Sequence, residues 1–110
     1  MTSDEFRELA LGLTDATEGA HMGHADFRLQ GKIFATLGYP DNQWGMIKLP
    51  PDEQAKYVEA YPGIFVPVKG KWGLQGATNV RLAGAPEAAV RGAMNVALLI
   101  AFKHSRNRRA

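Results

Sequence analysis

The sequence predicts an α+β domain in which an antiparallel sheet packs against N- and C-terminal helices. Short segments with alternating apolar and polar residues follow one another across tight turns, which is typical of antiparallel strands. Segments with apolar residues at helical spacing lie before and after them, and strands grouped between helices favour the α+β class. The chain has 110 residues, 45% of them hydrophobic, and no cysteine. This length supports one core without disulfides.

The first expected element is a helix that ends near Leu13. Thr2 and Glu5 have the spacing of a capping box, which satisfies two backbone N–H groups at a helix start; alternatively, Ser3 caps the helix, with two acids in its first turn. Apolar residues then recur at i, i+3, i+4 and i+7 and form one buried stripe. These residues are Phe6, Leu9, Ala10 and Leu13.

Three strands are expected next, over residues 27–29, 32–37 and 44–49. Gln30-Gly31 predicts a tight turn between the first two, because glycine adopts positive φ without steric cost. Residues 38–42 combine Gly, Pro, Asp and Asn and predict a longer turn.

The second half of the chain is expected to alternate helices and extended pieces. Proline and two acids suit the first turn of a helix that begins at residue 51. The expected elements are a helix over 51–61, an extended piece over 64–66, a loop or short strand over 69–76, a strand over 78–82 and a long helix over 86–103. Apolar residues lie nearly all round the last helix, which favours burial, or alternatively a homodimer surface on its outer side.

Charge is distributed unevenly along the chain. The net charge is +2, but the first 26 residues carry one Arg against six acidic residues, whereas the last eight carry four basic residues and no acid. We therefore expect a single domain over residues 1–103 and a basic, flexible tail over 104–110. The acidic start does not resemble a leader, and the longest apolar run, Val96–Phe102, is too short to cross a bilayer. A cytoplasmic protein without a membrane partner is expected.

The residues offer little for catalysis. Ser3 and Ser105 are the only serines, cysteine is absent, and no glycine-rich nucleotide-binding motif occurs. No enzyme activity and no cofactor are therefore expected. Glu18, His21, His24 and Asp26 are suitable types of metal ligand, but residues three positions apart on one strand, such as His21 and His24, point to opposite faces. We expect no metal site, with His21 in a sheet and His24 in a turn before the strand at Phe27.

Basic and aromatic residues are the remaining candidates for function. Cations gathered on one face attract phosphates, and an aromatic side chain stacks on a base. The candidate nucleic-acid-binding residues are Arg28, Lys32, Lys48, Lys69, Lys71, Trp72 and Arg81. The alternative interpretation is an ordinary solvated sheet face, with the tryptophan packed in the core.

Several short blocks together resemble the MmcQ/YjbR-like family of small bacterial proteins. They are Gly19–Asp26, Phe27–Leu37, Ile47–Leu49, Tyr61–Phe65, Lys71–Gly73 and Val80–Leu82. The resemblance extends from Phe6 to Lys103 and implies a CyaY-like fold, described as a double wing, with DNA binding as the function commonly predicted for it. Its recurrent polar and aromatic positions match Lys32, Lys48 and Trp72. The sequence departs from the family at Ala77 and Asn79, where related sequences have an aromatic and a basic residue, and it lacks a Ser-Tyr pair in the last helix.

Two functional hypotheses follow from these observations. The first is a nucleic-acid (DNA) binding domain that neutralises phosphates with the basic residues named above. The alternative is a homodimeric interaction module, or a small-ligand-binding module that uses Trp44, Trp72 and Phe34 on an apolar cleft, without catalytic activity.

Overall fold

The helices and strands lie in the order that the sequence predicts, with two additions. The computed structural model describes residues 1–13 and 15–109, and side chains as far as Lys103. The elements are α1 (Ser3–Leu11), β1 (Ala16–His21), β2 (His24–Leu29), β3 (Lys32–Leu37), β4 (Trp44–Lys48), α2 (Pro51–Ala60), β5 (Phe65–Pro67), α3 (Lys71–Leu74), β6 (Ala77–Arg81) and α4 (Glu87–Arg109).

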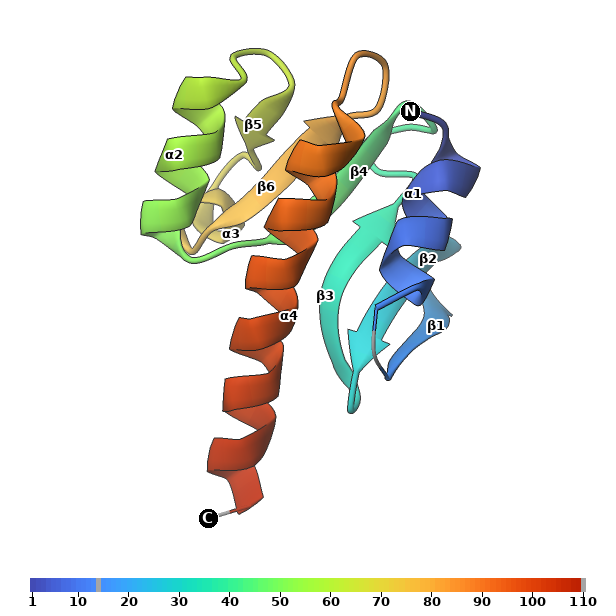
Figure 1. The fold of residues 1–110 in the computed structure, drawn as a ribbon, viewed down its shortest axis with the longest axis vertical. Coiled ribbons are helices and arrows are strands. Elements are labelled where there is room, and N and C mark those ends of the chain that lie inside the picture. Colours follow the sequence, from blue (N-terminus) through green and yellow to red (C-terminus); the bar gives the residue numbers. More distant parts are fainter. Residues whose placement is uncertain (14, 110) are drawn as a thin grey trace.

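The strands form one six-stranded antiparallel sheet in the order β1-β2-β3-β4-β6-β5. The last strand, β6, lies between β4 and β5, so the sheet brings the middle and the end of the chain together. The helices α1 and α4 cover one face of the sheet, and α2 lies beside β5 (Figure 1). The predicted α+β class, with an antiparallel sheet against terminal helices, is confirmed.

The core lies between α1, α4 and the sheet. Its largest buried side chains include Phe6, Phe27, Ile47 and Met94. The helix α4 buries a stripe of Val90, Met94, Ala97 and Ala101, whereas Leu99 and Phe102 on its other side are 55% and 39% exposed. Burial is therefore one-sided, and the homodimer interpretation of the outer side stays a prediction.

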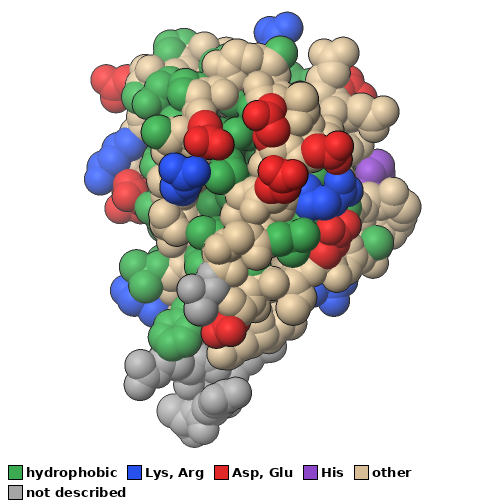
Figure 2. Space-filling model, turned by 45° about the vertical axis from the view of Figure 1, so that its right-hand side comes forward, with side chains coloured by type: hydrophobic (Ala, Val, Ile, Leu, Met, Phe, Trp, Pro, Cys, Tyr) green, Lys and Arg blue, Asp and Glu red, His purple; other side chains and the backbone are tan. Residues whose placement is uncertain are grey.

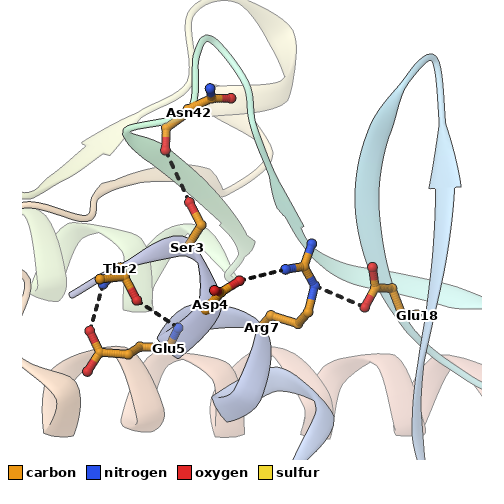
Figure 3. A network of polar contacts seen from close by, with 7 residues as sticks. All are labelled: Thr2, Ser3, Asp4, Glu5, Arg7, Glu18 and Asn42. Atoms are coloured by element: carbon orange, nitrogen blue, oxygen red, sulfur yellow. Dashed lines mark hydrogen bonds and ion pairs between the residues drawn. The ribbon is translucent and has the colours of Figure 1, made fainter.

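Polar contacts fix α1 against the sheet (Figure 3). The predicted capping box is confirmed, because Thr2 Oγ1 accepts from the Glu5 N–H and Glu5 Oε1 accepts from the Thr2 N–H. Two further hydrogen bonds tie the helix to the turn before β4 and to β1: Ser3 Oγ donates to the Asn42 carbonyl at 3.2 Å, and Arg7 Nε donates to Glu18 Oε1 at 3.1 Å.

Three local predictions are wrong. A strand, β1, precedes the three that were expected; it lies at the sheet edge with most side chains exposed, so its sequence lacks the alternation of a half-buried strand. His24 begins β2, because the turn is formed by Met22-Gly23, both with positive φ. Residues 71–74 form the short helix α3 where a loop or strand was predicted.

A close approach between α1 and β4 yields a test of the core. A Cβ atom on Gly45 would lie 2.8 Å from Cε2 and Cζ of the buried Phe6 ring. Gly45→Ala is therefore expected to lower the free energy of unfolding by about 1–3 kcal/mol, because the ring must shift within a packed core. Urea denaturation measures the effect. If the contact is responsible, Gly45→Ala costs less in a Phe6→Leu background than in the wild-type protein; equal costs in the two backgrounds would contradict it.

No helix within the described residues is long and apolar enough to cross a membrane.

Candidate phosphate-binding site

Lys32 and Lys48 lie at the same end of the sheet. Lys32 is the first residue of β3 and Lys48 the last residue of β4, and the two strands are antiparallel. Their ladder pairs Ala35–Leu37 with Gly45–Ile47 only. The first residues of β3 therefore continue beyond the part of the strand that pairs with β4.

An irregularity in β3 marks the place where the two strands separate. Phe27 pairs with Ala35, but the next residue of β2, Arg28, pairs with Ile33. One residue of β3, Phe34, is thus extra, as in a β-bulge, which bends a strand and interrupts its ladder.

A pocket of about 370 Å³ opens at this separation, and we name it the β3–β4 pocket. Its apolar wall comes from both strands and from α4, and includes Ile33, Leu49 and Ile100. Its polar groups are Lys32, Lys48 and Gln75. The pocket therefore combines an apolar wall with two ammonium groups and one amide.

The lining carries positive charge without a compensating carboxylate. Lys32 is half-buried and Lys48 is exposed. Among the described residues, neither lysine side chain has a hydrogen bond or an ion pair. A half-buried ammonium group without a counter-ion attracts an anion more strongly than a fully solvated one, because screening is weaker there.

The segment around α3 lies at the same end of the sheet. Ala77, the first residue of β6, pairs with Lys48 on one side, and its carbonyl accepts from the Val68 N–H on the other, at 3.0 Å. Lys69 directly follows Val68, and α3 then carries Lys71. The buried Gln54 of α2 fixes this segment by donating from Nε2 to the Gly73 and Ala77 carbonyls, both at 3.0 Å.

Trp72 of α3 is 67% exposed. The interpretation that packed this tryptophan in the core is therefore wrong. Of the three aromatic residues predicted for an apolar cleft, Phe34 lines the β3–β4 pocket, whereas Trp44 and Trp72 do not. We name Lys32, Lys48, Lys69, Lys71 and Trp72 together the basic end.

The two predicted arginines lie elsewhere. Arg81 is exposed at the opposite end of β6, where it pairs with Trp44. Arg28 lies on β2 and directs its guanidinium group to Asp26, with Nε 2.7 Å from Oδ1 and Nη2 3.0 Å from Oδ2. Arg81 is thus separated from the lysines along the sheet, whereas Arg28 lies beside Lys32 in the β2–β3 ladder but has its guanidinium group bound to Asp26.

Asp26, grouped with His21 as a metal-ligand candidate, is instead the centre of a polar network with His21 and Arg28 that was not predicted. Its side chain is fully buried, and His21 Nδ1 lies 2.8 Å from Oδ2, beside the two bonds from Arg28. The hydrogen bonds from Arg28, followed by the contact with His21, hold the pKa of Asp26 at about 2 against the opposing effect of burial. The available signal was the two-residue spacing of Asp26 and Arg28, which places both on one face of a strand.

The two histidines considered as weak metal-ligand candidates do not lie on one strand with opposite faces, as expected: they form a cross-strand pair of β1 and β2, which places both on the same face of the sheet. His21 contacts Asp26, whereas the His24 ring packs edge-on against Tyr39, with centroids 5.8 Å apart. The described part of the chain contains no group of three or more metal-ligating side chains.

Acidic side chains gather on a different surface. Figure 2 shows them over the face that α1 and β1 form. Asp4, Glu5 and Glu8 are exposed there on α1, and Glu18 lies on β1. The carboxylates nearest to the basic end in sequence are Asp52 and Glu53, in the first turn of α2. Glu53 forms an ion pair with Lys56 at 3.3 Å.

The family model YjbR matches residues 11–97 of the chain. Among solved structures, the chain is similar to Deinococcus radiodurans protein DR2400, described as a DUF419 domain, with a TM-score of 0.74 and 16% sequence identity. The similarity covers 90% of this chain and 77% of that chain, and at this identity it concerns the fold. No curated protein matches the chain.

Proposed function

The chain belongs to the YjbR family, and on that premise we propose that it binds DNA through the basic end of its sheet. The observation that carries this proposal is the convergence of four lysines from β3, β4 and the segment before β6, beside an exposed tryptophan. The acidic side chains over α1 and β1 lie on a different surface, so the protein would contact DNA from one side only.

Phosphate contacts are the interaction that this arrangement supports. Each lysine ammonium that replaces a condensed counter-ion on the DNA backbone contributes affinity that falls as salt rises. Lys48 and Lys71 come from different parts of the chain and are exposed, which leaves both free to reach successive phosphates. Trp72 offers a flat apolar surface for stacking on a base.

Salt dependence tests the proposal. Replacing Lys48 and Lys71 with glutamine is expected to weaken binding of a labelled DNA duplex and to lower the slope of log affinity against log salt by about 0.9 for each phosphate that the variant no longer neutralises. Fluorescence anisotropy between about 50 and 200 mM salt measures affinity and slope together.

Lys56→Gln is the matched control, because Lys56 is not part of the basic end and its ammonium group forms an ion pair with Glu53 on α2. It removes one positive charge, as each substitution of the double variant does, and should leave the slope unchanged. The proposal would be wrong if the wild-type protein did not bind DNA at low salt, or if the double variant behaved like this control.

A further inference from the structure

We propose that the β3–β4 pocket binds one mononucleotide unit, with its base against the apolar wall and its phosphate at Lys32 and Lys48. The inference deepens the proposed DNA binding and rests on it for the source of the nucleotide. It concerns an unpaired nucleotide, because the faces of a base in a duplex are covered by its neighbours in the stack.

The size of the pocket agrees with a ligand of this class. Pockets that bury small ligands measure about 300–1,000 Å³, and the β3–β4 pocket, at about 370 Å³, is near the lower limit. It has room for one compact ring system and its substituents, but not for several stacked units.

The wall of the pocket suits a planar apolar body. Ile33, Pro50 and Ile100 line it and are each half-buried, so part of their surface is available for contact. Leu49 and Phe34, which are almost fully buried, support this wall from behind. A base that covers these side chains removes apolar surface from water on both partners.

The polar groups of the pocket suit the rest of the nucleotide. Lys32 and Lys48 place two positive charges at the lining, and no carboxylate lines the pocket to compete for them. Gln75 contributes an amide, which both donates and accepts hydrogen bonds and so can pair with the polar edge of a base. An uncharged apolar ligand would leave both ammonium groups without a partner.

The first experiment separates the two halves of the ligand. Binding of adenosine monophosphate, adenosine and inorganic phosphate is measured by titration calorimetry and by amide shifts in NMR spectra. We expect adenosine monophosphate to bind at least about tenfold more tightly than either of the others, because both the base and the phosphate contribute. Equal affinity for the monophosphate and for phosphate alone would overturn the proposal, and so would equal affinity for the monophosphate and adenosine.

The second experiment identifies the source of the nucleotide. The probes are a five-nucleotide single strand, an abasic strand of equal length and charge, and a hairpin duplex. The single strand is expected to bind about tenfold more tightly than the abasic strand. If the abasic strand and the duplex bind as well as the single strand, the proposed DNA binding stands and the pocket proposal is wrong.

If adenosine monophosphate binds in the pocket and no strand binds, the pocket proposal stands and DNA binding is wrong. Binding of none of these probes would overturn both.

A pocket-filling variant locates the binding. Ile100→Trp fills the pocket from α4, whereas Leu99→Trp adds the same side chain at the next position, which is 55% exposed and does not line the pocket. We expect Ile100→Trp to remove the preference for the base, that is, the tighter binding of adenosine monophosphate than of inorganic phosphate. Leu99→Trp should retain this preference. Lys32→Gln supplies an independent test that does not alter the apolar wall, with Lys56→Gln as its control. Unchanged preference for the base in Ile100→Trp would place the base elsewhere, and unchanged affinity of Lys32→Gln for adenosine monophosphate would place the phosphate elsewhere; either result would overturn the proposal.

Discussion

Gly76→Ala is expected to prevent stable folding, with a loss of more than about 4 kcal/mol in the free energy of unfolding. Gly76 has a φ of 109°, and an added Cβ atom would lie 1.6 Å from the Leu49 carbonyl oxygen and 2.8 Å from its carbonyl carbon. These are backbone atoms at the end of β4, so no side-chain movement relieves the clash. The Gly76 carbonyl also accepts from the Leu49 N–H at 3.2 Å and from the buried Thr78 hydroxyl at 2.7 Å.

Gly31→Ala separates the clash with the Leu49 backbone from the cost of a positive φ, which are the two causes of the effect at Gly76. Gly31 also has a positive φ, 82°, but an added Cβ atom would meet nothing within 4 Å. Gly31→Ala should therefore lower the free energy of unfolding only by the cost of placing alanine in the left-handed conformation, about 1–2 kcal/mol. Urea denaturation followed by circular dichroism measures both variants. Similar losses in the two proteins would show that contact with the β4 backbone does not determine the need for glycine at position 76.

Asp26→Asn is expected to produce the second large effect, because it removes the charge of a fully buried carboxylate at the centre of a polar network. The carboxylate has a pKa of about 2, below its usual value of 3.8, chiefly through its hydrogen bonds with Arg28. A lowered pKa means that the ionised form stabilises the folded protein. At neutral pH this contributes about 2 kcal/mol. The amide loses this contribution and also places its NH2 group against a donor of Arg28 or His21.

The pH dependence distinguishes this loss from a simple packing defect. The stability from Asp26 is fully present above pH 3.8, the value for the unfolded chain, and decreases as the pH falls toward about 2. The extra stability of the wild-type protein over Asp26→Asn should therefore disappear as the pH falls from about 4 to 2. Thermal unfolding across this range measures the difference between the two proteins.

Glu59→Gln, at an exposed position on α2, is the control. Its difference in thermal stability from the wild-type protein should stay nearly constant across this pH range. A difference between wild-type and Asp26→Asn that is independent of pH would contradict the role assigned to the charge.

Most elements were predictable because their signals are local. The capping box of Thr2 and Glu5, the turn at Gln30-Gly31 and the proline at the start of α2 each act within a few residues of the chain. The misplaced segments lacked such signals. The strand β1 is an edge strand with little buried surface, and α3 is a four-residue helix held by distant contacts from Gln54.

The candidate site was predictable only in part. The sequence placed Lys32 and Lys48 at strand ends, and the resemblance singled out both together with Trp72. It did not separate Arg28 and Arg81 from the lysines, because that depends on what each side chain contacts in three dimensions. Arg28 turns toward Asp26, and Arg81 lies at the far end of β6.

Local sequence patterns predicted the fold class, because hydrophobic periodicity and turn chemistry are properties of neighbouring residues, and the resemblance of short sequence blocks indicated the family. Which cations lie together depends instead on how the strands pair. The placement of β6 between β4 and β5 brings the α3 segment next to Lys48, and the extra residue in β3 marks where the pocket opens beside Lys32. Both depend on pairing between residues far apart in the chain, which local patterns do not encode.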